Sequence, residues 1–368
     1  MTKINLQNER IKRKYYDWLK EAEGLAGSTI EKVERAINLW DEFTQSADYR
    51  TFKPETAKAF KKWLFERKNQ ATDKPISLTT CNHYLICLAD FFKWLSGQQG
   101  YKSKISLDKI AYLQLDKKQK KVAQNQSRKR YPTLEIIQKV VGSIEIKTEV
   151  DRRDRALLCF TLISAMRDEA IITLPIECLN IERQQVHQDP ERGVRTKFSK
   201  DILTTLFIFD PSFWKIVEDW VQYLKQEKLF TDQDPLFPAT KREQGIEDSY
   251  SFTAENVDNQ FWKGTDSIRT IFKKRFEAAG LEYFSPHSFR HTATKTAMEL
   301  CQTPAEFKAV SQNLGHENMA TTMFDYASLP DEEVEKKVKS IANNENNQEE
   351  AELIQRMLRN SNLKLSKK

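Results

Sequence analysis

The sequence predicts a mainly α-helical protein of two domains, with a small antiparallel β-sheet in the second domain. The 368 residues are about two to three times the usual length of one domain, so two domains are expected. Hydrophobic residues make up 39% of the chain and charged residues 30%, which is enough apolar material for packed cores. Only 10 residues are glycine, which disfavours turn-rich all-β folds and glycine-rich phosphate loops.

The composition also restricts where the protein acts and what it binds. No run approaches the roughly 18 apolar residues of a membrane span, and the first residues lack the apolar core of a signal peptide. We therefore expect a cytoplasmic protein without a membrane partner. The five cysteines are scattered and form no C-x-x-C pair, which predicts free thiols rather than disulfides or a zinc site. A net charge of +6 permits a polyanionic partner.

Residues 1–116 are expected to form a helical N-terminal domain. A capping box at Ser28 is followed by apolar residues at helical spacing over residues 28–43. A second amphipathic helix begins after Ser77, an N-cap candidate, and ends at Gly97. Weaker helical patterns lie at residues 6–22 and 54–67. Together these patterns predict a bundle of four or five helices.

A basic segment, residues 117–130, follows this domain. Seven of its fourteen residues are Lys or Arg, and none is acidic. The composition predicts an interdomain linker, and its charge favours a track for a phosphate backbone over a merely solvated connection. The DNA-binding candidates are Lys117, Lys118, Lys120, Lys121, Arg128, Lys129 and Arg130.

Residues 131–329 are expected to form the second domain. Thr133 precedes an amphipathic helix, and residues 155–163 are apolar nearly all round, as is typical of a helix in a domain centre. A turn at residues 189–193 between apolar segments predicts a small antiparallel sheet. Its expected strands are residues 185–187, 194–197 and 202–209.

Three of the five histidines lie near the end of this domain. His287 and His291 are four residues apart and could bind a metal from one helix face, as in H-E-x-x-H. Ser288 stands where that motif needs Glu, and no third ligand lies nearby, so a metal site is disfavoured. Imidazole and guanidinium groups in this region instead favour a site for a phosphate anion.

Five motifs occur in a fixed order along the second domain. They are Ser164-Ala165-Met166-Arg167, Thr196-Lys197, His287-Ser288-Phe289-Arg290, Leu314-Gly315-His316 and Tyr326. Together they resemble the catalytic domain of the tyrosine recombinase, or phage integrase, family over about residues 131–329. Residues 28–43 and 79–95 are similar to the helical N-terminal core-binding domain of that family. Each motif is weak alone, but the ordered set is specific.

The resemblance implies transesterification of DNA. Arg167 and Arg290 would neutralise the charge that develops on a phosphodiester, and His316 would hydrogen-bond the phosphate. Tyr326 would attack the phosphorus and keep the strand as a 3′-phosphotyrosine. The bond energy is preserved for rejoining, so the expected cofactors are none, neither metal nor ATP.

The proton transfers have candidate residues as well. A tyrosine has a reference pKa near 10 and needs an acceptor for its proton, for which His287 is the candidate. The leaving 5′ oxygen needs a proton, and a cationic lysine beside the phosphate is a suitable donor. Lys197 occupies the family's hairpin position, and Lys200 is the alternative. Taken singly, Arg167 could instead cap its helix and Tyr326 could pack in a core.

The sequence departs from the family pattern at two places. An acid usually stands three residues after the first Arg, where this chain has Ala170, and Glu169 comes one position early. Support of Arg167 by a neighbouring carboxylate is therefore in doubt. Tyr326 follows His316 by ten residues where nine is commoner, so the nucleophile's segment can differ in shape. Asp325 should point away from the phosphate because it would repel it.

The expected function is that of a site-specific recombinase that integrates or excises a mobile element. By resemblance, four protomers would act on two double-stranded DNA sites, each closing its two domains around the duplex. Accessory DNA-bending or directionality proteins are further candidate partners. The tail, residues 330–368, carries Ile354, Met357 and Leu358 at helical spacing and would dock on a neighbouring protomer.

Three other functions remain open from the sequence. A type IB topoisomerase or a hairpin telomere resolvase would use the same chemistry. A catalytically silent DNA-binding regulator could be built on the same fold. A metal-dependent nuclease is disfavoured because the sequence contains no compact acidic cluster.

Overall fold

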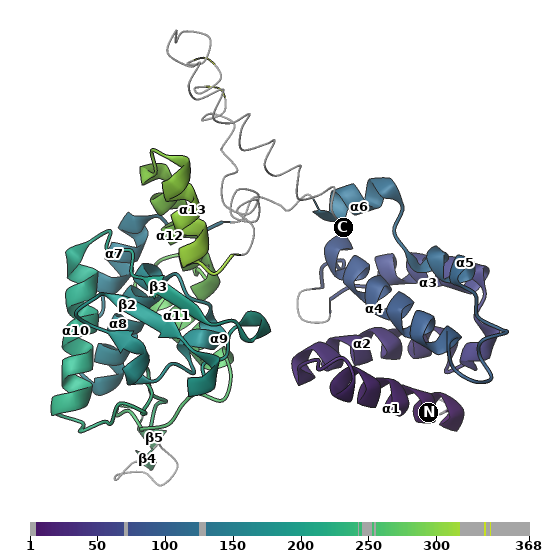
Figure 1. Ribbon diagram of the computed structural model, residues 1–368, viewed down its shortest axis with the longest axis horizontal. Helices are drawn as coiled ribbons and strands as arrows, with labels where there is room; N and C mark the ends of the chain where they lie inside the picture. Colours follow the sequence, from purple (N-terminus) through teal and green to yellow (C-terminus); the bar gives the residue numbers. More distant parts are fainter. Residues whose placement is uncertain are drawn as a thin grey trace. The chain divides into compact units, whose positions relative to one another are not determined.

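The computed structural model describes residues 5–69, 73–124, 130–241, 243–244, 252–253 and 255–316, together with the helical positions 335 and 339. The chain divides into two compact units, Met1–Lys129 and Arg130–Lys368. Each unit has its own hydrophobic core. The described part is mainly helical with a small antiparallel sheet, which confirms the predicted fold class (Figure 1).

The N-terminal unit consists of helices. They are α1 (Leu6–Glu21), α2 (Gly27–Thr44), the 3-10 turn η1 (Tyr49–Thr51), α3 (Pro54–Glu66), α4 (Leu78–Ser96), α5 (Leu107–Ile110), the 3-10 turn η2 (Ala111–Leu113) and α6 (Lys117–Gln124). Helix α4 packs against α2, α3, α5 and α6, because its buried stripe runs from Cys81 to Leu95. The weaker helical patterns at residues 6–22 and 54–67 are therefore confirmed as α1 and α3.

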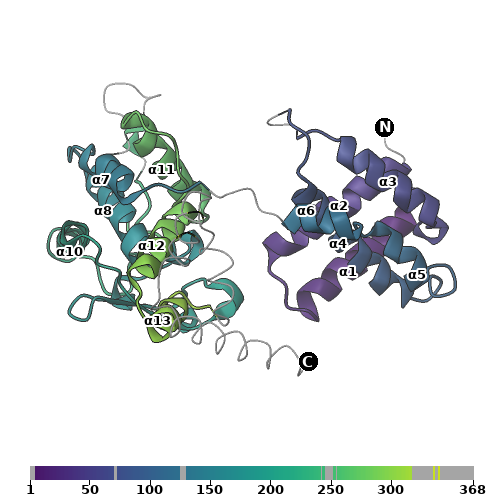
Figure 2. The same cartoon turned by 90° about the horizontal axis from the view of Figure 1, so that it is seen from above.

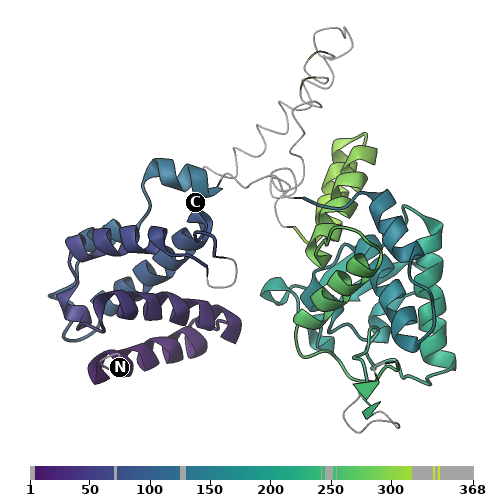
Figure 3. The same cartoon turned by 180° about the vertical axis from the view of Figure 1, so that it is seen from behind.

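Aromatic rings fill the core of this unit. Trp40 of α2 meets Phe92 of α4 edge to face at 5.2 Å, and Phe52 lies 4.3 Å from Phe92 between ring centroids. A buried polar group joins α1 to α2, where the Lys12 Nζ donates to Asp41 Oδ2 at 3.0 Å. Tyr49 Oη donates to the same carboxylate at 2.8 Å. The two purple helices, α1 and α2, accordingly run side by side (Figure 3).

Two helix starts differ in how well the sequence predicted them. Ser77 Oγ accepts a hydrogen bond from Thr80 N at 3.1 Å, which confirms Ser77 as the N-cap of α4. The capping box expected at Ser28 is wrong, because the N-cap of α2 is Ala26, two residues earlier, and the helix begins at Gly27. Ala26 has no side-chain acceptor to offer, so no cap hydrogen bond forms there.

The basic segment is helical in its first part rather than a linker throughout. Residues 117–124 form α6, which packs on α4. Ala123 is buried, and its carbonyl accepts a hydrogen bond from Thr79 Oγ1 at 2.9 Å. The charged sequence of residues 117–124 does not by itself predict a helix, and this contact with α4 stabilises one.

The C-terminal unit contains helices and two small antiparallel sheets. Its helices are α7 (Leu134–Gly142), α8 (Glu149–Ser164), α9 (Asp168–Ile171), α10 (Pro211–Gln226), α11 (Asp266–Ala278), α12 (Pro286–Leu300) and α13 (Pro304–Asn313). The 3-10 turns are η3 (Ile176–Cys178), η4 (Pro190–Arg192) and η5 (Lys197–Ser199). The strands are β1 (Leu179–Asn180), β2 (Gln185–Gln188), β3 (Ile202–Thr205), β4 (Glu243–Gln244) and β5 (Phe252–Thr253).

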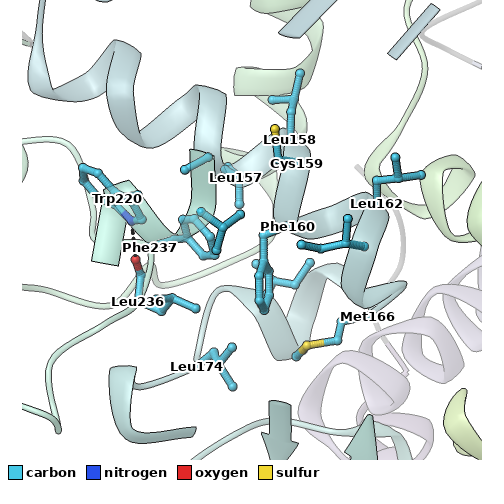
Figure 4. Packing of buried hydrophobic residues seen from close by; sticks show 14 of the residues in the cluster. Leu157, Leu158, Cys159, Phe160, Leu162, Met166, Leu174, Trp220, Leu236 and Phe237 are labelled. Atoms are coloured by element: carbon cyan, nitrogen blue, oxygen red, sulfur yellow. Dashed lines mark hydrogen bonds between the residues drawn. The ribbon is translucent and has the colours of Figure 1, made fainter. Parts of the chain in front are cut away.

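Helix α8 forms the centre of this unit. Every residue from Ala156 to Ser164 is buried, as its all-round apolar sequence predicts. Helices α10 and α12 pack on different sides of α8 (Figure 2). Figure 4 shows Leu157 and Phe160 of α8 close to Phe237 and Trp220. The Nε1 of Trp220 donates a hydrogen bond to Leu236 O at 2.8 Å.

The start of α8 is held by ionic contacts. Glu149 accepts hydrogen bonds from Lys228 Nζ at 2.9 Å, Tyr223 Oη at 2.7 Å and Val257 N at 2.9 Å. Burial opposes the charge of Glu149, but these hydrogen bonds outweigh it and lower the pKa of the carboxyl. The contacts therefore tie α8 to α10 and to residues near 257.

The larger sheet is antiparallel, as predicted, but its order β1-β2-β3 includes a strand, β1, that the sequence did not predict, and β3 is shorter than the expected residues 202–209. Val186 pairs with Leu179 on one side and with Thr204 on the other. The strand expected at residues 194–197 is wrong: Val194 is buried in the core and Arg195 N donates to Thr173 Oγ1, so neither joins the sheet. The strand expected to reach residue 209 ends at Thr205, because Phe207 N donates to Ile163 O of α8 at 2.7 Å.

Candidate phosphate-binding and strand-transfer site

Arg290 joins three segments of the C-terminal unit. It lies on α12, whose Phe289 packs against Phe272 of α11 at 4.9 Å, and only 2% of Arg290 is exposed. Its Nη1 donates to Ala165 O at 2.6 Å, just after α8. Its Nη2 donates to Leu314 O at 2.7 Å and lies 3.1 Å from His316 Nε2. The structure thus brings together two candidate residues, Arg290 and His316, and the backbone next to a third.

That third candidate, Arg167, follows the end of α8. Helix α8 ends because Ala165 adopts the left-handed conformation, with φ at 50°. Met166 N then donates to Ser164 Oγ at 3.3 Å, and Arg167 continues in an extended conformation. Arg167 is half-buried, and within the described part of the chain its guanidinium has no hydrogen-bond or ion-pair partner.

The acids after Arg167 turn to other partners. Asp168 Oδ2 accepts from Arg269 Nη2 of α11 at 2.9 Å. Glu169 is exposed, with Arg195 Nη1 at 3.9 Å from its carboxylate, and Ala170 is buried. No hydrogen bond or ion pair joins the carboxylate of Asp168 or Glu169 to the Arg167 guanidinium, so these two acids do not provide the support that the sequence placed in doubt.

Gly315 shapes the turn that carries His316. Its φ is +70°, in the left-handed region that favours glycine. A Cβ at this position would lie 2.6 Å from Cδ1 of Ile202 in β3. Glycine is therefore needed both for the turn and for its close approach to the sheet. His316 N donates to Ser311 O at 3.1 Å, which fixes the residue at the end of α13.

Lys197 and Lys200 lie in the segment between β2 and β3. Lys197 is exposed in η5, and Lys200 is half-buried just after it. Phe198 lies between them, 79% exposed and with φ at 63°. The two ammonium groups lie 4.9 Å and 5.9 Å from the centre of its ring. The structure places both lysines on one loop and leaves the choice of proton donor between them open.

His287 and His291 lie next to each other on α12. His287 is exposed, and its ring meets that of His291 edge to face at 5.1 Å. His291 is buried and stacks on Tyr131 at 6.3 Å, and Thr292 Oγ1 donates to Pro132 O at 2.5 Å. The first residues of the unit are thereby fastened to the helix that carries His287 and Arg290. In the described residues no group of three or more His, Cys, Asp or Glu is arranged to hold a metal.

The basic candidates have different positions. Lys117, Lys118 and Lys121 are exposed on α6, and Lys120 Nζ donates to Gln114 Oε1 at 3.1 Å. Arg130 is exposed and pairs with Glu282 at 2.7 Å. Arg128, Lys129 and the nucleophile candidate Tyr326 lie outside the described residues, as do Asp325 and the apolar stripe of the tail.

Sequence reasoning missed two basic residues beside α6. Lys61 Nζ of α3 donates to Gln114 O at 3.0 Å, and Lys58 Nζ lies 4.7 Å from the Tyr112 ring centre. Burial, with the nearby charge of Lys58, lowers the pKa of Lys61. Gln114 therefore links the basic face of α3 to Lys120 of α6. A cluster of lysines at residues 58–62 was the signal in the sequence, but only the fold shows that Lys61 shares Gln114 with Lys120 of α6.

No helix in the described ranges is long and apolar enough to cross a membrane. No curated protein matches the sequence. The model of the family described as "Phage integrase family" matches residues 135–333, which is more than half of the chain and contains all five sequence motifs. This match confirms the resemblance stated from those motifs.

Solved structures share the fold at low sequence identity. A lambda integrase fragment, residues 75–356, bound as a dimer to a COC′ core site has 12% identity and a TM-score of 0.60, covering 87% of this chain and 95% of that one. The Tn1549 transposon integrase in complex with transposon right end DNA has 14% identity and a TM-score of 0.54, with coverage of 90% and 99%. XerH recombinase bound to its difH substrate has 16% identity and a TM-score of 0.54, with coverage of 89% and 83%.

Proposed function

Because the chain belongs to the phage integrase family, we propose that it is a site-specific tyrosine recombinase that cuts and rejoins double-stranded DNA. The observation that carries the proposal is the position of Arg290. This buried guanidinium connects the end of α8, next to Arg167, with the turn that holds His316. Arg290 and His316 lie together beside the backbone next to Arg167, which supports the proposal that these three residues would bind one phosphate.

The donor set suits the charge of phosphoryl transfer. A phosphodiester attacked by a hydroxyl gains negative charge on its non-bridging oxygens. Arg167 has no hydrogen-bond partner among the described residues, so its guanidinium can donate to such an oxygen. His316 Nε2 accepts from Arg290 Nη2 in this arrangement, so His316 would donate to the phosphate through Nδ1. Two guanidinium groups can neutralise this charge without a metal ion. Loss of one preorganised donor typically costs about 10²–10³ in rate.

The reaction balances with residues of this chain. Tyr326 Oη forms a bond to phosphorus as the bond from phosphorus to the 5′ oxygen breaks. The phenolic proton passes to a base, for which His287 is proposed, and the 5′ oxygen takes a proton from Lys197 or Lys200. The products are a 3′-phosphotyrosine and a free 5′-hydroxyl. Attack by another 5′-hydroxyl reverses these steps, so ATP is not consumed.

The N-terminal unit would hold the DNA by its phosphates. Lys117, Lys118 and Lys121 are exposed on α6, and Lys61 of α3 donates to Gln114, which also bonds Lys120 of α6. Arg128, Lys129 and Arg130 would continue this contact toward the second unit. The neighbouring integrase structures are bound to core-site or transposon-end DNA, which supports duplex DNA as partner. We further propose assembly of four protomers on paired sites of a mobile element in the cytoplasm, with the tail on a neighbour and accessory proteins setting direction.

Covalent trapping tests this function. Nicked suicide duplexes tiled from the DNA that flanks the gene would be incubated in EDTA without ATP, with the wild type, Tyr326→Phe and Arg290→Ala. We expect an SDS-resistant adduct with the wild type, none with Tyr326→Phe, and at least about 100-fold slower formation with Arg290→Ala. An adduct that persists in Tyr326→Phe would contradict the assigned nucleophile.

The same assay separates the alternatives. Tight DNA binding with no adduct on nicked duplexes or four-way junctions would favour a silent regulator. Relaxation or hairpin products without site pairing would favour a topoisomerase or telomere resolvase. Cleavage that EDTA abolishes would favour a metal-dependent nuclease.

A further inference from the structure

Asn313 is bonded to the backbone of a strand 108 residues away. It is the last residue of α13, and its side-chain amide faces Thr205 of β3. Thr205 N donates to Asn313 Oδ1 at 2.7 Å, and Asn313 Nδ2 donates to Thr205 O at 2.8 Å. The amide thus satisfies both backbone groups of Thr205, on an edge strand, as a neighbouring strand would. These two hydrogen bonds form a joint between the end of α13 and β3.

Further contacts extend this joint along β3. Thr204 Oγ1 donates to the carbonyl of Asn313 at 3.0 Å and accepts from Gln188 Nε2 of β2 at 3.0 Å. Ile202, at the start of β3, lies under Gly315, where a Cβ would not fit. Three of the four residues of β3, Ile202, Thr204 and Thr205, therefore contact the end of α13 or the turn that follows it.

The joint lies between two groups of the proposed reaction. His316 comes three residues after Asn313 on one side. On the other side, Lys197 and Lys200 lie on the loop that leads directly into Ile202. We propose that Asn313 is a positioning residue that holds this lysine loop in register with the phosphate-binding groups. The inference rests on the proposed function, because it assigns a role within the same site.

The contacts of the His316 turn and of the lysine loop indicate which of the two depends more on Asn313 for its position. The turn at His316 has a second anchor, since Arg290 Nη2 donates to Leu314 O and lies 3.1 Å from His316 Nε2. The lysine loop is held before η5, where Arg195 N donates to Thr173 Oγ1 at 2.9 Å, and Thr196 Oγ1 donates to Lys200 O at 2.6 Å. Lys197 itself is exposed, and Phe198 and Ser199 after it lie in the left-handed region, which costs a non-glycine residue conformational energy, so the position of this segment depends on how β3 is anchored. Without the Asn313 amide, we therefore expect the lysine loop to shift while His316 stays near Arg290.

A change of leaving group separates these two sides. A 5′ oxygen leaves as a strongly basic alkoxide unless it is protonated, whereas a thiol has a reference pKa near 8.5 and its thiolate leaves without a proton. A suicide duplex with sulfur in place of the bridging 5′ oxygen therefore does not need the lysine. Attack by Tyr326 and charge neutralisation by the arginines are still required on both substrates.

The experiment compares Asn313→Leu with the wild type in single-turnover adduct formation. Asn313→Leu is nearly isosteric and removes both amide bonds, and Gln312→Ala changes an exposed neighbouring side chain as the control. We expect Asn313→Leu to slow cleavage of the oxygen substrate by about 10- to 100-fold, since a displacement near 1 Å can cost that much. On the sulfur substrate the cleavage rate of Asn313→Leu should stay within about threefold of the wild type. This loss of rate is smaller than the loss caused by removing one donor to the phosphate.

Several results would overturn this inference. Equal losses on the two substrates would show that Asn313 does not act through the proton donor, and an unchanged rate on the oxygen substrate would show that it positions nothing. If Asn313→Leu fails to fold, Asn313→Asp serves instead, because it keeps the acceptor for Thr205 N and loses the donor to Thr205 O. Its loss must again be larger on the oxygen substrate.

A second readout does not depend on chemistry. Exchange of the Thr205 amide hydrogen should be faster in Asn313→Leu than in Gln312→Ala, because its acceptor is removed. Equal exchange in the two variants would contradict the joint itself. Absence of any wild-type adduct on both substrates would overturn the proposed function, and the role of Asn313 with it, whereas a normal wild-type adduct isolates the test of Asn313.

Discussion

Gly315→Ala should damage the site through one identified contact. The substitution places a Cβ 2.6 Å from Ile202 Cδ1 in a residue with φ at +70°. The left-handed backbone costs a non-glycine residue about 1–2 kcal/mol. Overpacking of a close contact adds about 1–3 kcal/mol. We therefore expect the free energy of unfolding of the C-terminal unit to fall by about 2–5 kcal/mol.

The chain offers a matched control for the backbone part of this cost. Gly280 has φ at +68°, and a Cβ there would meet nothing within 4 Å. Gly280→Ala should therefore lose only the conformational cost, about 1–2 kcal/mol. The difference between the two variants in urea unfolding measures the clash with Ile202.

A compensating change tests the contact directly. Ile202→Val removes the Cδ1 atom and should cost about 0.5–1.5 kcal/mol alone. Combined with Gly315→Ala it should recover at least about 1 kcal/mol of the sum of the two single losses. Adduct formation should fall by about 100-fold in Gly315→Ala because His316 is displaced, and should recover partly in the double variant. Simple additivity, or equal losses in Gly280→Ala and Gly315→Ala, would refute the reasoning.

Three further predictions concern the stability and charge of the two units. Trp220→Phe leaves Leu236 O without its donor and opens a small cavity, so it should lower the unfolding free energy by about 2–3 kcal/mol, whereas Trp18→Phe at an exposed site should change it by less than about 0.5 kcal/mol. Because the pKa of Glu149 is lowered in the folded protein, its ionised carboxylate stabilises the fold above the usual carboxyl pKa, and this stabilisation is lost as pH falls through the folded-state pKa. In thermal unfolding, Glu149→Gln should therefore be less stable than the wild type at pH 7 and should lose less stability on acidification. Parallel stability profiles of the two proteins against pH would contradict this. Replacing Lys117, Lys118 and Lys121 by Ala should make the slope of log K for DNA against log salt shallower by about 0.9 for each phosphate that these lysines neutralise, and an unchanged slope would remove α6 from the interface.

Periodicity predicted most helices because local spacing determines which face of a helix is buried. The stripe from Cys81 to Leu95 and the apolar run in α8 were readable for this reason. Helix α6 was not, because its packing depends on the contact between Ala123 and Thr79 of another helix. The capping box at Ser28 failed since a cap depends on where the helix begins, and periodicity leaves that uncertain by a residue or more.

The candidate site was likewise predictable from the sequence only in part. Ordered motifs identified Arg167, Arg290 and His316 as candidates, and the structure places Arg290 beside His316. The role of Gly315 against Ile202 and the joint made by Asn313 were not visible, because each partner lies over 100 residues away in the sequence. Lys197 was expected on a strand, but the neighbouring Val194 turns into the core instead of extending the sheet.

The most direct test of the central claim is to identify the residue that carries the DNA. The SDS-resistant adduct from a suicide duplex would be digested with protease and nuclease, and the modified peptide sequenced by mass spectrometry. We predict a nucleotide 3′-phosphate linked to Tyr326 and to no other residue. A nucleotide on a different side chain, or unmodified Tyr326 in an enzyme that has cleaved its DNA, would contradict the proposal that this chain transfers strands through Tyr326.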